Sequence, residues 1–108
     1  MQQLDFLVKG SSAEPYEITF IKDGDSLTAI CTCPAGTYGN FCKHRIAILD
    51  GDSKAVSSDN ADKVATVVEW LPGTDVAEAL AQLRAAESEG LKDAVAKSKK
   101  KLARAMNT

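Results

Sequence analysis

The sequence predicts an α+β protein in which a small three-stranded antiparallel sheet and a short helix clamped by nearby side chains precede a helical C-terminal region. Three observations carry this prediction. Apolar and polar residues alternate with a period of two through much of the first 33 residues. Four potential metal ligands then fall within fourteen residues, between positions 31 and 44. Beyond position 60 the apolar residues recur at the spacing of α-helices.

The alternating stretches predict three strands. The first is expected over residues 4–9 and the second over 16–21, because apolar side chains occupy every second position. Asp23-Gly24 is typical of a hairpin turn, since glycine tolerates positive φ. The third strand is expected over residues 27–33 and ends at Pro34, because proline cannot donate to a strand ladder.

The next stretch positions two pairs of potential ligands. On the third strand Cys31 and Cys33 are two residues apart and therefore share a face. Residues 34–41 are expected to form a loop, and a short helix is expected from Cys42 or Lys43 to about position 50. Side chains at i and i+2 of a helix point about 200° apart. For Cys42 and His44 to reach one ion, Cys42 must precede the helix and His44 must lie in its first turn.

The remainder of the chain predicts a linker and helices. Gly, Asp and Ser dominate residues 51–60, as in a linker. One helix is expected to begin at Asp59 or Asn60 and to stop at Pro72-Gly73. Another begins at Thr74 or Asp75, and Gly90 either breaks it or is tolerated within it. The predicted organisation is therefore residues 1–50, a linker at 51–60 and a helical region at 61–108.

Composition limits the class of protein. The 108 residues carry a formal charge of −2, which hides a split between an acidic body and a basic tail. Residues 1–90 contain 7 Lys/Arg against 14 Asp/Glu, whereas residues 91–108 contain 6 against 1. The sequence shows neither an apolar run near the roughly 20 residues of a membrane span nor a secretory signal. We therefore expect a cytoplasmic protein with no membrane contact.

The three cysteines and the single histidine of the chain all lie in the ligand cluster. They read Cys-x-Cys, eight residues, Cys-x-His, with Cys31, Cys33, Cys42 and His44 as the donors. Two pairs of soft donors joined by a loop are what a tetrahedral Zn²⁺ site needs. The alternatives are iron and a Cys31–Cys42 disulfide, which would leave Cys33 unpaired. Oxidation that ejects the metal, as in a redox-sensing switch, is compatible with zinc binding.

This pattern closely resembles the SWIM zinc finger, a family defined by Cys-x-Cys, a variable loop and Cys-x-His. Pro34 after the second cysteine and Lys43 before the histidine also fit, as do the strands upstream. The resemblance covers about residues 4–50 and implies one structural Zn²⁺ held by the four donors. It also implies a non-enzymatic module for nucleic-acid binding or protein interaction, as SWIM fingers are regarded in larger proteins such as transposases and chromatin-remodelling ATPases.

The residue types present also argue against catalysis, independently of the resemblance to the SWIM family. Catalytic zinc usually keeps three protein ligands and one open position, whereas four donors fill the tetrahedron here. The sequence contains neither a second histidine to act as general base nor the zinc deaminase pattern. We therefore expect no enzymatic activity.

Basic residues mark candidate contact surfaces for DNA, RNA or another protein. Lys43 and Arg45 flank the histidine, and Tyr38 and Phe41 lie in the loop before it. On a helical tail one face carries four cations, namely Lys97, Lys100, Lys101 and Arg104. These positions suit phosphate contacts, but solvated faces, which in the tail pair with the acidic body, are the simpler explanation.

Overall fold

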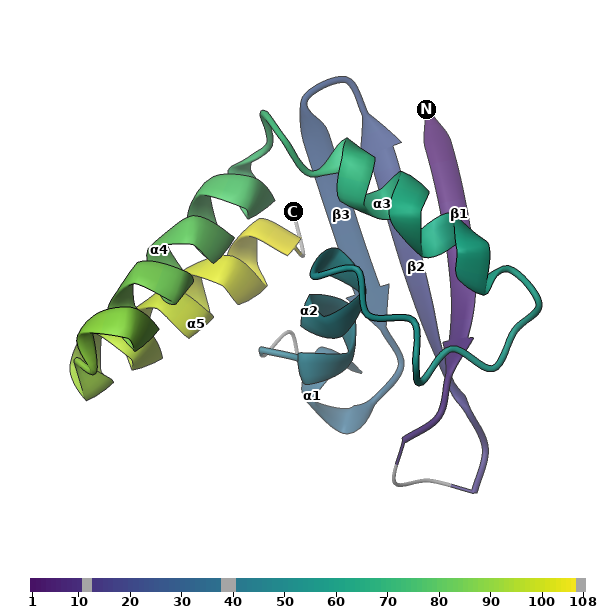
Figure 1. Ribbon diagram of the computed structural model, residues 1–108, viewed down its shortest axis with the longest axis horizontal. Helices are drawn as coiled ribbons and strands as arrows, with labels where there is room; N and C mark the ends of the chain where they lie inside the picture. Colours follow the sequence, from purple (N-terminus) through teal and green to yellow (C-terminus); the bar gives the residue numbers. More distant parts are fainter. Residues whose placement is uncertain (11–12, 38–40, 107–108) are drawn as a thin grey trace.

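The computed structural model describes residues 1–10, 13–37 and 41–106. Three strands form one antiparallel sheet in the order β1-β2-β3, with β1 at Gln2–Val8, β2 at Tyr16–Asp23 and β3 at Ser26–Cys31. The helices are α1 (Pro34–Thr37), α2 (Lys43–Leu49), the 3₁₀ helix η1 (Ala61–Lys63), α3 (Val64–Trp70), α4 (Asp75–Glu89) and α5 (Lys92–Met106). The predicted α+β class with a three-stranded antiparallel sheet is confirmed (Figure 1).

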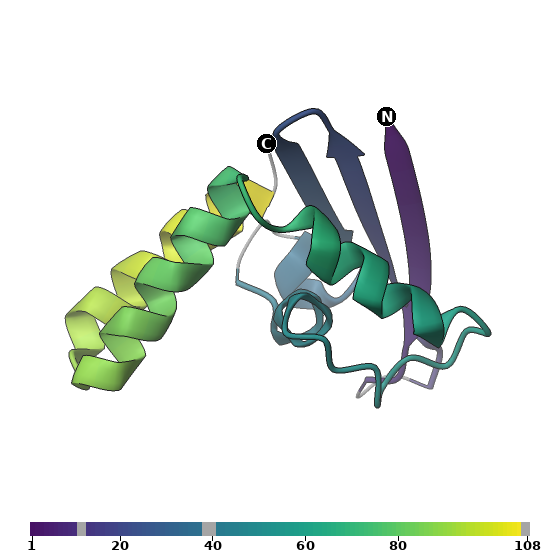
Figure 2. The same cartoon turned by 45° about the horizontal axis from the view of Figure 1, so that its top comes forward.

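The period-two alternation works as expected because one face of the sheet is buried and the other is largely open. Phe6, Ile18, Phe20 and Ala29 are almost fully buried on the inner face, whereas Leu7 and Ile30 point outward and are exposed. Helices α2 and α3 lie over the inner face (Figures 1 and 2). The Phe6 and Phe20 rings meet edge to face, with centroids 6.0 Å apart, at the centre of that face.

Two predicted boundaries around the ligand cluster were wrong. Strand β3 ends at Cys31 and not at Cys33, and the expected loop after Pro34 begins with the short helix α1. Pro34 occupies the first helical position, where a missing N–H costs nothing. The Thr37 N–H donates to the Cys33 carbonyl at 2.8 Å. Cys33 therefore belongs to the turn that follows the strand and not to the strand itself.

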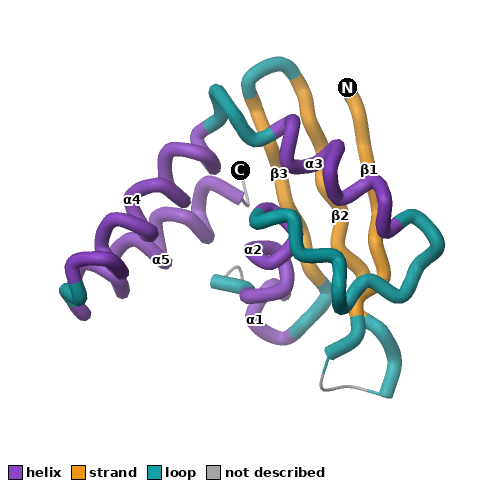
Figure 3. The backbone as a smooth tube through the Cα atoms, viewed as in Figure 1, coloured by secondary structure: helices purple, strands orange, loops and turns teal. Residues whose placement is uncertain are grey.

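The C-terminal helices form an antiparallel hairpin. Gly90 breaks the helical run, because it caps α4 with a left-handed φ of 71°. Helices α4 and α5 run side by side and extend from the edge strand β3 (Figures 1 and 3). No helix in the described parts of the chain is both long and apolar enough to cross a bilayer.

The segment predicted as a linker is irregular, but it pairs with the free edge of β1. The Lys9 N–H donates to the Ala55 carbonyl at 2.8 Å, and the Ser57 N–H donates to the Leu7 carbonyl at 2.7 Å. Val56 forms the bridge between them, opposite Val8. These bonds cover part of an edge that would otherwise present unpaired backbone groups.

One apolar cluster joins the N-terminal and C-terminal halves. Its members come from the sheet, the ligand region and the last three helices, and they include Phe20, Ile48, Val67, Leu83 and Met106. Leu102 and Met106 bring α5 into this cluster with fully buried side chains. The helical region therefore packs on the sheet, while the division of the chain into three parts stays a prediction.

The N-cap of α4 provides a first test of the fold. Thr74 is buried, and its hydroxyl accepts the Ala77 N–H at 3.1 Å. Replacing Thr74 with Ala should lower the free energy of unfolding by about 1 kcal/mol, because one N–H at the start of α4 loses its partner. Urea unfolding followed by circular dichroism measures this change. Thr66→Ala, within α3, serves as the control, and equal costs for the two variants would contradict the capping role.

Candidate metal centre

The end of β3 and the turn after it position the first two cysteines. Cys31 pairs with Ile18 of β2 and points to the buried face of the sheet. The ladder continues for one residue, since the Thr32 N–H donates to the Glu17 carbonyl at 3.0 Å. Cys33 then lies at the start of the α1 turn, where its sulfur accepts the Gly36 N–H at 3.3 Å. The turn thus brings both sulfurs to the same place although Cys33 has left the strand.

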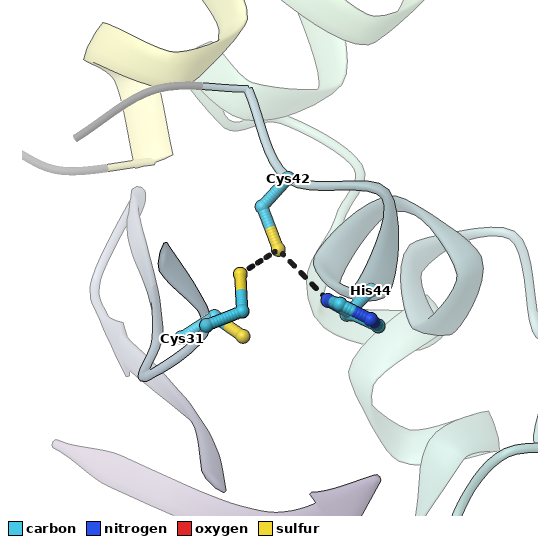
Figure 4. A group of neighbouring side chains, drawn as sticks. Cys31, Cys42 and His44 are labelled. Carbon is cyan, nitrogen blue, oxygen red and sulfur yellow. Dashed lines mark hydrogen bonds between the residues drawn. The ribbon is translucent and has the colours of Figure 1, made fainter. Parts of the chain in front are cut away.

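The start of α2 positions the other two donors. Cys42 is the N-cap residue and has extended backbone angles, φ −131° and ψ 115°. His44 lies in the first turn of the helix, as predicted from the i, i+2 geometry. Figure 4 shows Cys31, Cys42 and His44 pointing toward one another, with the imidazole Nδ1 3.6 Å from the Cys42 sulfur.

The spacing of the four donor atoms fits one zinc ion. All four lie within 4.8 Å of one another, and the sulfurs of Cys33 and Cys42 are 3.3 Å apart. Bonds of about 2.3 Å to sulfur and about 2.0 Å to nitrogen place the corners of a tetrahedron roughly 3.5–3.8 Å apart. The three cysteines are free thiols rather than a disulfide. The donors are therefore already close to the arrangement that the ion requires.

The thiols of Cys31 and Cys42 shift each other's pKa in opposite directions. A hydrogen bond from Cys31 lowers the pKa of Cys42 to about 4, against an ordinary value of 9.0. The same bond, together with burial, raises the pKa of Cys31 well above its ordinary value. Cys42 therefore loses its proton more readily than Cys31, and metal binding must displace the protons that remain on the thiols.

The imidazole is held by its neighbours. The ring of Tyr16 packs against that of His44, with centroids 5.2 Å apart and planes tilted by 52°. A methyl group at Gly10 would clash with the Tyr16 ring at 2.3 Å and would lie 3.4 Å from Nε2, so only glycine leaves room here. The Tyr16 ring therefore packs against the imidazole while Nδ1 faces the Cys42 sulfur.

Comparison with known families agrees with this geometry. Residues 16–50 match the profile of the family described as SWIM zinc finger. Residues 16–50, the segment that matches this family, are termed the SWIM finger. The matched segment contains the four donors, and a Cys₃His cluster of this kind takes one zinc ion. No curated protein and no solved structure matches the chain.

The candidate contact residues of the SWIM finger have different surroundings. Lys43 is exposed at the start of α2. Arg45 is 0% exposed, and its Nη1 donates to the Ala29 carbonyl of β3 at 2.8 Å. The prediction that Arg45 contributes to a contact surface was therefore wrong, because this side of α2 faces the sheet. Arg45 instead ties α2 to β3 beneath the metal site.

The predicted tail cations all lie on α5, away from the four donors. Lys97, Lys100, Lys101 and Arg104 are exposed. Outside the apolar cluster, Lys99 is a further contact between α5 and the SWIM finger, since its ammonium group lies 5.0 Å from the centroid of the Phe41 ring. The sequence did not point to this contact because Lys99 is off the predicted basic face. Tyr38, the other candidate aromatic, lies outside the described residues.

Proposed function

We propose that this chain is a non-enzymatic binding module in which a structural Zn²⁺ holds a surface for a protein partner. One observation carries the proposal. The four donors already surround a single point, and the three cysteines are only 1–3% exposed. An ion at that point would have four protein ligands and would keep no position for a substrate or a reactive water.

The position of the donors indicates what the ion does for the fold. Cys31 ends β3 at the edge of the sheet and Cys33 follows it, whereas Cys42 caps α2 and His44 lies in its first turn. An ion bound to all four closes the segment between them and fixes α2 against β3. The proposed role of zinc is therefore to hold the shape of the surface around α2. When bound, the ion would supply coordination bonds and no reactive position.

Cobalt substitution tests whether the site is structural. Co²⁺ in place of Zn²⁺ should give the intense visible bands of a four-coordinate sulfur site, because the ion keeps four protein ligands. Those bands should stay unchanged when azide is added, since no open position remains. A spectrum that shifts with azide would show an exchangeable ligand position and would overturn the proposal of a purely structural ion.

A nucleic-acid partner is the second candidate, and helix α5 favours it. Both ion pairs within the described residues involve Arg84, one with Asp50 and one with Glu87. The exposed cations of α5 are therefore not neutralised within that part of the chain. Near Lys99, a groove of about 330 Å³ is lined by Tyr16, Phe41 and Lys43 among others. Aromatic rings beside cations suit the stacking of bases in a single strand.

The salt dependence of binding tests this candidate. A fluorescent single-stranded DNA or RNA 20-mer should bind with an affinity that falls steeply as salt rises, because phosphate contacts release counterions. The double variant Lys97→Glu/Lys100→Glu should reduce the log–log slope by at least about 1. Lys22→Glu/Lys63→Glu carries the same charge change outside α5 and should leave the slope unchanged. Equal effects of the two double variants would contradict a site on α5.

We propose the cytoplasm as the compartment. The support is chemical, since three buried thiols within one zinc site persist as ligands only under reducing conditions. The close approach of Cys33 and Cys42 also means that an oxidant would join them and release the ion, as in a redox-sensing zinc switch.

A further inference from the structure

A hollow lies on the side of α2 next to His44, away from the sulfur cluster. It is bounded by the end of β1, by α2 and by the segment 52–56 that pairs with β1. Its volume is about 640 Å³, within the range of about 300–1,000 Å³ typical of ligand sites. The floor is apolar and consists of Val8, Ala47, Ile48 and Val56.

The rim of the hollow is cationic, although residues 1–90 as a whole are acidic. Lys9, Lys43 and Lys54 come from three separate segments, and all three are exposed. Among the described residues that line the hollow, Asp52 is the single acid, and its carboxylate already accepts the Lys54 backbone N–H at 3.0 Å. An apolar floor beneath three lysines fits a ligand that has an apolar body and a negative charge.

The second nitrogen of His44 adds a directed donor to this wall. Nδ1 faces the Cys42 sulfur, so zinc binding there fixes the proton on Nε2. Nε2 lies beside Gly10, which lines the hollow. Metal-bound histidines usually donate this proton to a carboxylate, a carbonyl or water. Within the described residues Nε2 has no hydrogen-bond partner, so a carboxylate from outside would complete the arrangement.

We propose that this hollow binds an acidic peptide segment of a protein partner. An apolar side chain of the peptide packs on Ala47 and Val56, and a neighbouring carboxylate accepts the His44 Nε2–H and pairs with the lysines. The inference rests on the proposed function and gives the partner its chemistry. A phosphate backbone matches the lysines but brings no aliphatic group for the floor, which favours the peptide over nucleic acid.

The test uses the zinc-loaded full chain and a fluorescein-labelled peptide, Glu-Asp-Leu-Phe-Asp-Glu. Fluorescence anisotropy should show saturable binding to the wild-type chain. The neutral peptide Gln-Asn-Leu-Phe-Asn-Gln and the acidic peptide Glu-Asp-Ser-Gly-Asp-Glu should each bind about tenfold more weakly or worse, since each lacks one of the two features. Equal binding of all three peptides would overturn the proposal.

Two variants locate the site. Lys54→Glu on the rim and Ala47→Phe in the floor should each weaken binding about tenfold. The control Lys63→Glu has the same charge change as the rim variant, lies in η1 outside the hollow and should bind like the wild type. Circular dichroism and zinc stoichiometry confirm that each variant is folded. A Lys63→Glu loss equal to that of Lys54→Glu would overturn the assignment to this hollow.

Two further measurements separate the possible failures. An unlabelled single-stranded DNA 20-mer that displaces the peptide, with the same dependence on Lys54, would replace the peptide with a polyanion and overturn the inference. If the peptide fails to bind while the cobalt spectrum shows a closed four-ligand site, the inference fails and the proposed function stands. If the spectrum shows an open position, the proposed function itself fails.

Discussion

Removal of the metal is expected to unfold the SWIM finger. Zinc binding in finger peptides contributes about 10–16 kcal/mol of apparent free energy at pH 7, which matches or exceeds the roughly 5–15 kcal/mol stability of a typical domain. The four donors join the end of β3 to the start of α2. Without the ion, three buried thiols and an imidazole lose their common partner, and the segment that connects the sheet to α2 loses its main constraint.

Cys33→Ser provides the genetic form of this experiment. Elemental analysis of the variant should show less than one zinc per chain. Residues 16–50 should unfold, and the circular dichroism spectrum should lose their contribution. Because α4 and α5 share one apolar cluster with the sheet, we expect the loss to spread to the helical signal. Thr32→Ser is the matched control, since it keeps the hydroxyl that accepts the Glu17 N–H at 2.9 Å.

A chelator allows metal-free and zinc-loaded protein to be compared without a substitution. Wild-type protein treated with a strong chelator should follow the Cys33→Ser spectrum, and readdition of Zn²⁺ should restore the native one. A native circular dichroism spectrum of the metal-free protein would contradict the prediction that metal coordination keeps residues 16–50 folded.

Gly36→Ala is expected to have the second largest effect. A methyl group at this position would lie 2.4 Å from the carbonyl oxygen of Cys31 and 2.9 Å from its Cβ. Both are far inside van der Waals contact, and neither atom belongs to a flexible side-chain end. Relief of the clash must move either α1, which Cys33 directly precedes, or the end of β3, which carries Cys31. We expect a loss of about 1–3 kcal/mol from overpacking.

The same substitution should weaken zinc binding. The Gly36 N–H donates to the Cys33 sulfur at 3.3 Å, so displacement of the turn also removes a hydrogen bond from a ligand. Loss of such supporting bonds typically costs about 10–100-fold in metal affinity. Competition with a chromogenic chelator measures this change, and thermal unfolding of the zinc-loaded protein measures the stability.

Gly24→Ala provides the control for Gly36→Ala. Gly24 has a φ of +59°, but a methyl group at this position would meet nothing within 4 Å, so the cost comes from the backbone alone. We expect about 1–2 kcal/mol from the left-handed conformation and unchanged zinc affinity. If Gly36→Ala binds zinc as tightly as Gly24→Ala does, the close packing of the turn against Cys31 has no role in the site.

Much of the metal site follows from short-range pattern. The four donors are the whole supply of cysteine and histidine in the chain. The positions of Cys42 before α2 and of His44 within it were also predictable. Helix geometry alone sets the directions of side chains two residues apart. The end of β3 could not be predicted in this way. The alternation of apolar residues continues through Cys33, but the strand has already ended at Cys31 and the backbone turns into α1.

The sequence by itself determined the ligand set, the three strands, the helical C-terminal half and the family of residues 16–50, since each depends on residues close together in the chain. Tertiary packing alone decided that Arg45 is buried against β3 and that Lys99 reaches Phe41. It also decided that Lys9, Lys43 and Lys54 meet around one hollow. Periodicity shows which face of an element is apolar, but only the packing of distant elements determines which charged side chains are enclosed and which converge.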